Sequence, residues 1–473
     1  INAVRATGAT QPISTGDGAW GIEITGHDNG FALREIAPYV DFVGPHVYRM
    51  ERDLVRQHHM AAFVAELAGF TGQPVVLEEF GVTTDFVSSA NAGHYYRQLL
   101  HNTLLSGTTG WIAWNNTDYD DLFAQPPYSH HAFEMHFGIT DSTGQPKTPL
   151  FELRDFATVL EQVDVARCVR PDTDAAIVVP SYLEVAYPFT EEADRSALFG
   201  TLHQSFVAAR EADLPVGFAR EVDGIPDDVR LIIVPSVKQL TAPAWHRLAH
   251  LAEAGATVYV SYCAGAHSVQ RGPWYADVNG LFGVRHQLVY GMNNPIEADE
   301  IEVTFTRDFG SIPAQAVLRF RAGGNDDSRA FLPIEVDSAD VVAVDGRGRP
   351  VLTIRRAGAG CVVFSTYPFE HMAAQLRDVN PEPTYQIYDA LAVIAGISRT
   401  VVTDDPRVNV GELTHEDGRR FVWFISQASD EVTVKPRASD GGWLRGLGGT
   451  DALIDVTLPP YGVAVCQLEA DVT

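Results

Sequence analysis

The sequence predicts a mixed α/β protein that runs from a parallel α/β region, through a second α/β region, into a small antiparallel β-sandwich. In residues 1–157 short apolar runs alternate with stretches of helical periodicity, a βαβα series that favours a parallel sheet. Residues 158–171 have the composition of a linker, and residues 172–398 resume the α/β alternation. In residues 399–473 short alternating strands are separated by turn residues, as is typical of a β-sandwich.

The first region supplies four predicted strands and two predicted helices. The strands are expected at Gln11–Ser14, Tyr39–Val43, Pro74–Leu77 and in "GWIAWNN" (110–116), with helices over 53–67 and 91–105. Polar and aromatic residues gather where each strand ends. In parallel α/β folds, and in (β/α)8 barrels above all, that edge carries the active site.

The second region begins with buried parallel-type strands and becomes richer in β signals later. We expect strands in "AAIVVP" (175–180) and "RLIIVPS" (230–236), a helix over Ser196–Ala212, a helix that stops at Gly255, and a helix over 382–396. The third region is predicted to form strands in "RVNVGELTH", "RFVWFISQ", "EVTVKP" and "DALIDVTLPPYGVAVCQLE".

Composition excludes several classes of partner. The net charge of −27 argues against a nucleic-acid partner and against an acidic membrane surface, since both require clustered positive charge. The sequence contains no run of eighteen apolar residues, so we expect no transmembrane helix. The four cysteines form no CxxC pair, so we expect no metal site and no cofactor. The lack of disulfide-like pairing favours the cytoplasm and leaves secretion open.

Five residues at neighbouring strand ends form the candidate site. His46 and Tyr48 lie two apart and are expected to point the same way; Glu79 ends the next strand, and Trp114 with Asn115 ends the last. A carboxylate, an imidazole, a phenol and an indole on one rim suit cleavage of a glycosidic bond. The carboxylate would attack the anomeric carbon, and the indole would pack on a sugar ring.

Each of these residues also has a structural interpretation. A lone Glu at a strand end is usually solvated or paired with a cation, and a lone histidine or aromatic residue usually serves packing. Their joint placement on consecutive strands of one rim is what favours the functional interpretation.

These motifs together resemble glycoside hydrolase family 5 and its clan of (β/α)8 barrels. "HVY" is similar to the His-x-Tyr of the sixth barrel strand, "PVVLEEFG" to the nucleophile strand, "GWIAW" to the eighth strand, and "FGITDSTGQPKTPLFEL" to the segment leading to the last helix. The resemblance implies that Glu79 is the nucleophile, that His46 and Tyr48 bracket it, and that Trp114 lines the sugar subsite. Strand alternation then predicts that Glu78 faces away from the barrel lumen.

The resemblance covers only strands five to eight of such a barrel. The acid/base of the family is the Glu of an Asn-Glu pair after strand four, and no Asn-Glu pair occurs in these 473 residues. A retaining enzyme requires that second carboxylate about 5–5.5 Å from the nucleophile. We therefore expect the N-terminal half of the barrel to come from a preceding segment or a second chain.

The second region resembles the amidotransferase-like trimerisation domain of family 42 β-galactosidases, and "LPPYGVAVCQL" resembles the small β domain that follows it. This resemblance implies a homo-oligomer, specifically a trimer. Cys263 lies where amidotransferases place their nucleophile, but "SYCAGA" lacks the glycine before the cysteine that permits the nucleophile turn. Cys263 is therefore predicted to be structural.

Two further groups of residues lie on the predicted rim. Asp17 and Trp20 follow the first strand and are candidate sugar contacts. The loop after Trp114 contains acidic residues and histidines whose spacing fits no metal-ligand pattern, so we predict a lid rather than a metal site. These loop residues are Asp118, Asp121, His130, His131 and Glu134.

The leading hypothesis is a retaining β-glycosidase that acts from the end of short β-linked oligosaccharides. The family 5 resemblance implies a β-mannosidase-like activity. The alternatives are a family 42-type β-galactosidase, and a non-catalytic fragment for assembly or carbohydrate binding that lacks the acid/base.

Overall fold

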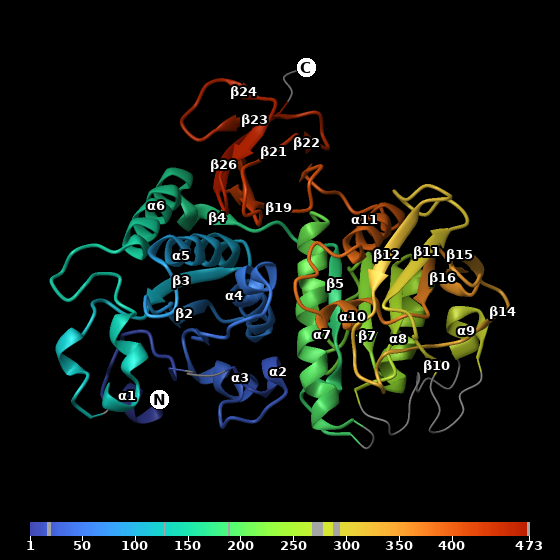
Figure 1. The fold of residues 1–473 in the computed structure, drawn as a ribbon, viewed down its shortest axis with the longest axis horizontal. Helices are drawn as coiled ribbons and strands as arrows, with labels where there is room; N and C mark the ends of the chain where they lie inside the picture. Colours follow the sequence, from blue (N-terminus) through green and yellow to red (C-terminus); the bar gives the residue numbers. More distant parts are fainter. Residues whose placement is uncertain (17–19, 127, 188–189, 267–277, 287–293, 471–473) are drawn as a thin grey trace. The chain divides into compact units, whose positions relative to one another are not determined.

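The computed structural model describes residues 1–16, 20–126, 128–187, 190–266, 278–286 and 294–470. These residues form two compact units (Figure 1). The first unit comprises Ile1–Ile24, Asp28–Pro171 and Thr400–Thr473, and the second comprises Thr25–His27 and Asp172–Arg399. The C-terminal β region thus groups with the N-terminal α/β region, although some 230 residues of sequence separate them.

A three-stranded parallel sheet in the order β1-β2-β3 carries the candidate site. Its strands are β1 (His46–Val47), β2 (Val75–Phe80) and β3 (Thr108–Ala113). The predicted strand at Gln11–Ser14 is wrong, because this segment pairs with no neighbouring strand. It is instead tied to the carboxylate of Asp41, which accepts the Ile13 N–H at 2.7 Å. The predicted strand Tyr39–Val43 is reduced to one bridge between Val43 and Val75.

Three long helices accompany this sheet: α4 (Leu54–Ala68), α5 (Ser89–Leu104) and α6 (Thr148–Val163). Side-chain caps start two of them: Asp53 accepts from the Arg56 N–H, and Ser88 accepts from the Asn91 N–H. Short helices precede the sheet, at α1 (Asn2–Ala6), α2 (Ile22–Thr25) and α3 (Leu33–Ile36).

The two faces of this sheet differ. Helices pack on one face, where Phe80 contacts Tyr96 of α5 and Trp111 contacts Phe156 of α6. On β3, Ile112 follows Trp111 and so points to the opposite face, where its side chain is 55% exposed. An exposed isoleucine in the middle of a strand shows that the described residues leave this face open.

The C-terminal region forms a six-stranded antiparallel sheet in the order β24-β23-β26-β20-β19-β4. Its strands are β4 (Cys168–Val169), β19 (Val408–His415), β20 (Arg420–Ser426), β23 (Trp443–Gly446), β24 (Ala452–Leu453) and β26 (Val463–Glu469). Two further pairs join β18 (Val401–Val402) to β22 (Arg437–Ala438) and β21 (Val432–Val434) to β25 (Val456–Leu458). β4 comes from the segment predicted as a linker, and Gln98 of α5 donates to the Ser426 carbonyl at 2.9 Å.

The second unit contains a nine-stranded mixed sheet in the order β12-β11-β15-β16-β17-β8-β7-β5-β6. The parallel part comprises β5 (Ala175–Val179), β6 (Gly217–Arg220), β7 (Leu231–Val237), β8 (Thr257–Tyr262) and β17 (Gly360–Ser365). The antiparallel part adds β11 (Glu300–Phe305), β12 (Val317–Arg321), β15 (Asp340–Asp345) and β16 (Pro350–Ala357).

Three helices of the second unit lie near their predicted positions: α7 (Glu192–Glu211), α8 (Ala242–Ala254) and α11 (Thr384–Ala395). Two short helices, α9 (Val278–Phe282) and α10 (Phe369–Ala374), were not predicted. Gly255 ends α8 with a φ of 130°, which confirms the predicted glycine stop. Among the described residues, no helix has both the length and the apolar composition needed to cross a membrane.

Candidate active site

An irregularity in β2 shapes the strand end that bears the two glutamates. Leu77 pairs with Trp111, but the next pair is Phe80 with Ala113, so three steps on β2 match two steps on β3. This is a β-bulge at Glu78 and Glu79. Because Leu77 and Phe80 are both fully buried, the two glutamates between them escape the alternation of a regular strand.

Two side chains hold Glu79: His46, which lies in β1, and Tyr48, which follows β1 directly. The Tyr48 hydroxyl donates to Glu79 Oε2 at 2.9 Å, and His46 Nδ1 lies 3.2 Å from the same oxygen. Burial, followed by the charge of Glu79, raises the pKa of Tyr48 far above its usual value, so the phenol stays a hydrogen-bond donor. The structure therefore brings together Glu79, His46 and Tyr48 as the sequence predicted.

Glu78 lies on the same side as Glu79, and the prediction that it turns away is wrong. His46 Nε2 is 3.9 Å from Glu78 Oε2, while the other ring nitrogen faces Glu79. Ser14 donates to Glu78 Oε1 at 2.5 Å. The bulge is the physical reason, because it ends the alternation that would have separated the two glutamates. Leu77 before them and Phe80 after them both face the helices, so both glutamates project to the other side.

The glycine after Phe80 has a steric role. A Cβ on Gly81 would collide with the carbonyl oxygen of Trp114, so only glycine lets the chain leaving β2 approach the end of β3 so closely. The Trp114 N–H donates to the Phe80 carbonyl at 2.9 Å. This close approach brings Trp114, whose side chain is partly exposed, to the rim that bears Glu79.

A pocket of about 470 Å³ opens beside Glu79. Tyr48 and Trp114 line it, together with the loop that follows β2 and the loop that follows β3. Its remaining lining residues are Met50, Gly81, Val82, Thr83, Phe86, Val87, Phe133, Glu134 and Phe137. The volume is in the range of small-molecule sites, and Glu79 and Glu134 are the carboxylates that line it.

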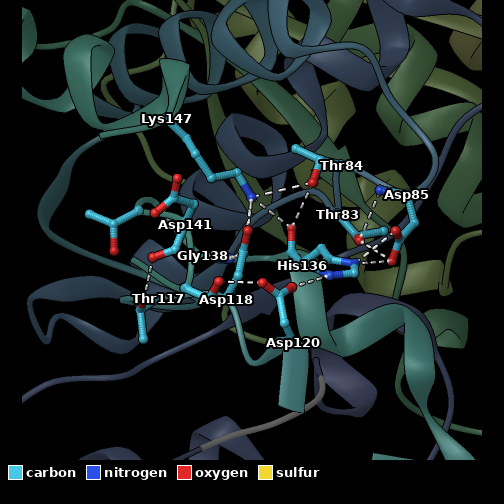
Figure 2. Close-up of polar contacts among 12 residues, drawn as sticks. Thr83, Thr84, Asp85, Thr117, Asp118, Asp120, His136, Gly138, Asp141 and Lys147 are labelled. Atoms are coloured by element: carbon cyan, nitrogen blue, oxygen red, sulfur yellow. Dashed lines mark hydrogen bonds and ion pairs between the residues drawn. The ribbon is translucent and has the colours of Figure 1, made fainter. Parts of the chain in front are cut away.

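Two polar clusters hold the loops that form the pocket wall (Figure 2). In the first, Lys147 Nζ lies 2.9 Å from both carboxylate oxygens of Asp118 and donates to the His136 carbonyl at 3.1 Å. It also donates to Thr84 at 3.3 Å. Lys147 therefore links the loop after β2 to the loop after β3.

In the second cluster the His136 ring lies between two carboxylates (Figure 2). Nδ1 is 2.8 Å from Asp85 and Nε2 is 2.9 Å from Asp120. Partial burial opposes the charged ring, but the hydrogen bonds to Asp120 and Asp85 outweigh it and raise the pKa of His136. Hydrogen bonds from Ser142 and His136 lower the pKa of Asp120.

Three other predicted sugar contacts have different outcomes. Trp20 is buried, and its Nε1 donates to the carbonyl of His46 at 2.6 Å, so it supports β1 and is absent from the pocket lining. Asn115 is also buried and absent from the lining, and neither polar atom of its side chain has a hydrogen-bond partner among the described residues. Asp17 lies outside the described residues.

The loop after β3 supplies one wall of the pocket. Phe133, Glu134 and Phe137 from this loop line it, and Phe86 from the loop after β2 stacks on Phe133 with ring centroids 6.4 Å apart. Within the described part of the chain, no three or more His, Cys, Asp or Glu side chains are grouped as metal ligands would be.

Comparison with known proteins finds glycosidases with a similar fold. No protein-family model matches the chain. It is 18% identical to the β-galactosidase Pbg of Clostridium perfringens over 348 residues, which are 71% of this chain and 47% of that protein. The chain thus spans about half the length of this curated relative.

Solved structures are similar over most of the chain. The β-galactosidase of Bacillus circulans sp. alkalophilus matches with a TM-score of 0.66 and 14% identity, covering 92% of this chain and 61% of that one. The GH42 β-galactosidase Gan42B of G. stearothermophilus matches with a TM-score of 0.66 and 14% identity, covering 92% of this chain and 60% of that one. The exo-β-1,4-mannosidase Op5Man5 of Opitutaceae bacterium strain TAV5 matches with a TM-score of 0.55 and 20% identity, covering 76% of this chain and 60% of that one. At these identities the similarity establishes a shared mixed α/β fold.

Sequence reasoning missed the residues that hold the pocket wall. His136, Asp85 and Lys147 were not predicted, because each contacts a partner from a different loop. Glu78 was assigned to the wrong face. The signal available for Glu78 was the pair of adjacent carboxylates itself, since a bulge is one way to bring two consecutive side chains to the same face.

Proposed function

We propose that the first unit carries the nucleophile half of a retaining β-glycosidase site, with Glu79 as the nucleophile. One observation carries this proposal: the Tyr48 hydroxyl donates to Oε2 of Glu79 and His46 Nδ1 lies 3.2 Å from the same oxygen, beside a pocket bordered by Trp114. Two polar groups at one oxygen orient the carboxylate and leave Oε1 to attack the anomeric carbon.

The reaction would proceed by double displacement. Glu79 Oε1 forms a bond to the anomeric carbon while the glycosidic C–O bond breaks, and an acid donates a proton to the leaving oxygen. Water, deprotonated by the same group, then attacks the glycosyl ester and releases Glu79 as a carboxylate. The indole of Trp114 would support the apolar face of the sugar ring.

The acid/base carboxylate is proposed to come from barrel strands outside this chain. The open sheet face around Ile112 supports a barrel whose remaining strands would cover it, since an exposed apolar sheet face is otherwise unfavourable. Glu134 is the carboxylate of this chain that competes for the role, because it lines the same pocket.

Galactosides are the first candidate substrates. The relative Pbg and two of the structural neighbours described above are β-galactosidases, which supports the galactosidase alternative over the mannosidase-like prediction. β-Mannosides are the second candidate, favoured by the similarity to the exo-β-1,4-mannosidase. A trimer, an oligosaccharide substrate and a cytoplasmic location remain proposals from the sequence.

The test uses the complete protein with aryl β-galactosides and aryl β-mannosides. Glu79→Ala should abolish turnover, and sodium azide should restore it by forming the glycosyl azide of inverted configuration, because azide enters the space left by the carboxylate. Wild-type turnover in Glu79→Ala would overturn the proposal. Glu134→Gln is the matched variant: if it loses activity towards poor leaving groups only, and azide yields the retained product, the acid/base lies in this chain.

A further inference from the structure

We propose that Glu78 is a positioning residue for the reaction, acting through His46 on the nucleophile. This inference rests on the proposed function of Glu79. It assigns a role to the carboxylate that the sequence alone led us to expect outside the site. Three observations carry it: the contact to His46, the hydrogen bond from Ser14 and the space that Gly44 leaves free.

The imidazole of His46 lies between two carboxylates. Its Nδ1 is 3.2 Å from Glu79 Oε2 and its Nε2 is 3.9 Å from Glu78 Oε2. Each ring nitrogen thus faces a different carboxylate, so a change in the position of Glu78 should alter how the ring meets Glu79.

The carboxylate of Glu78 has few other partners among the described residues. Its Oε2 is buried and makes no hydrogen bond among the described residues, so the His46 ring is the facing group that can offset its charge. Its Oε1 accepts the Ser14 hydroxyl at 2.5 Å, which fixes the carboxylate in orientation. A half-buried carboxylate of fixed orientation that faces one imidazole therefore helps to position that ring.

Gly44 leaves the space that this carboxylate occupies. A Cβ at Gly44 would overlap the Glu78 carboxyl group, and the Gly44 backbone is not in the left-handed region that glycine alone tolerates. The chain thus keeps a glycine here for the Glu78 side chain rather than for a turn. This gives an independent way to displace Glu78 without changing its charge.

The effect on the reaction follows from where negative charge develops. Glu79 loses its charge when it forms the glycosyl ester and regains it when water releases the sugar. A donor held at Oε2 by His46 stabilises the departing carboxylate, so Glu78 should speed the second step more than the first.

The experiment measures both steps with a dinitrophenyl glycoside in the complete protein. Glu78→Gln should lower kcat about tenfold and lower KM in parallel, because the glycosyl-enzyme accumulates. A burst of dinitrophenol with wild-type amplitude should precede the slower steady state. Glu161→Gln, an exposed glutamate on α6, is the charge-matched control and should behave as wild type.

Gly44→Ala should reproduce the slow second step, and it should add nothing further in a Glu78→Ala background, where the overlap is gone. Unchanged kcat, KM and burst kinetics in Glu78→Gln would overturn the proposal. A reduced burst amplitude with unchanged KM would also overturn it, because the variant would then lose only folded protein and the role of Glu78 would be structural. Full activity in Glu79→Ala would instead contradict the proposed function, so the two failures are distinct.

Discussion

Parallel strands of both units end in polar side chains, but among the described residues the spaces beside those strand ends differ greatly in size. In the first unit Glu79, Tyr48 and Trp114 face a pocket of about 470 Å³. In the second unit Lys238 and Cys263 follow β7 and β8 and line a cavity of about 10 Å³, the space of one water molecule.

The buried polar side chains at the strand ends of the second unit are paired with other buried side chains. Lys238 Nζ lies 2.8 Å from Asp194, and each side chain is only 1% exposed. Ser236 and Ser261 both donate to the buried carboxylate of Glu370. Burial raises the pKa of Cys263 to about 12, so its thiol stays protonated, in agreement with its predicted structural role. The comparison teaches that polar residues at strand ends indicate an active site only where the packing leaves them a cavity.

The largest expected effect contrasts the two strand ends directly. Glu79→Gln should reduce kcat/KM for an aryl β-glycoside by about 10⁴-fold or more, since a lost nucleophile is not replaced by its neighbours. Cys263→Ala should leave kcat/KM unchanged. Steady-state kinetics on purified variants check both. Activity loss in Cys263→Ala with a normal melting temperature would break the comparison.

The second effect concerns stability in the second unit. Lys238→Met should lower the free energy of unfolding by about 3–5 kcal/mol, because it leaves Asp194 buried without its cation. Arg285→Met removes the exposed pair with Asp337 and should cost at most about 1 kcal/mol. Urea denaturation followed by circular dichroism distinguishes them. Equal costs would mean that the Lys238 pair is solvated in solution.

A third, smaller effect tests the contacts of the nucleophile. Tyr48→Phe removes the hydroxyl that donates to Glu79 and should lower kcat/KM about tenfold. Because the pKa of Tyr48 is raised, the wild-type advantage should persist undiminished into alkaline solution. A pH–rate profile of both proteins checks this. Convergence of the two profiles at alkaline pH would show that the phenol ionises there.

The smallest effect concerns the pocket wall. The pKa of His136 is raised in the folded protein, so its contribution to stability is full below about pH 6.5 and is lost as the pH rises through the folded value. His136→Gln should therefore lower the urea midpoint at about pH 6 and have little effect at about pH 9. Exposure of the ring and both carboxylates keeps the difference small. A pH-independent difference would indicate lost packing instead.

Local pattern was sufficient for much of the fold. The helical pattern of the sequence places α4 and α5 to within a few residues, because an amphipathic stripe repeats within a few turns. Strand β2 and the arrival of Glu79, His46 and Tyr48 at one rim follow from parallel βαβ order alone. The prediction of a strand at Gln11–Ser14 was wrong, because a short apolar run becomes a strand only if a neighbouring strand is available to pair with it.

The sequence by itself determined the mixed α/β class, the long helices α4, α5, α7 and α11, and the strand ends at which chemistry was expected. Only the tertiary structure decided which of those ends opens on a pocket, and that Glu78 joins Glu79 at His46. The physical reason is that side-chain direction along a strand is local until a bulge interrupts it. Cavities and cross-loop contacts, such as those of His136 and Lys147, depend on segments that meet only after folding.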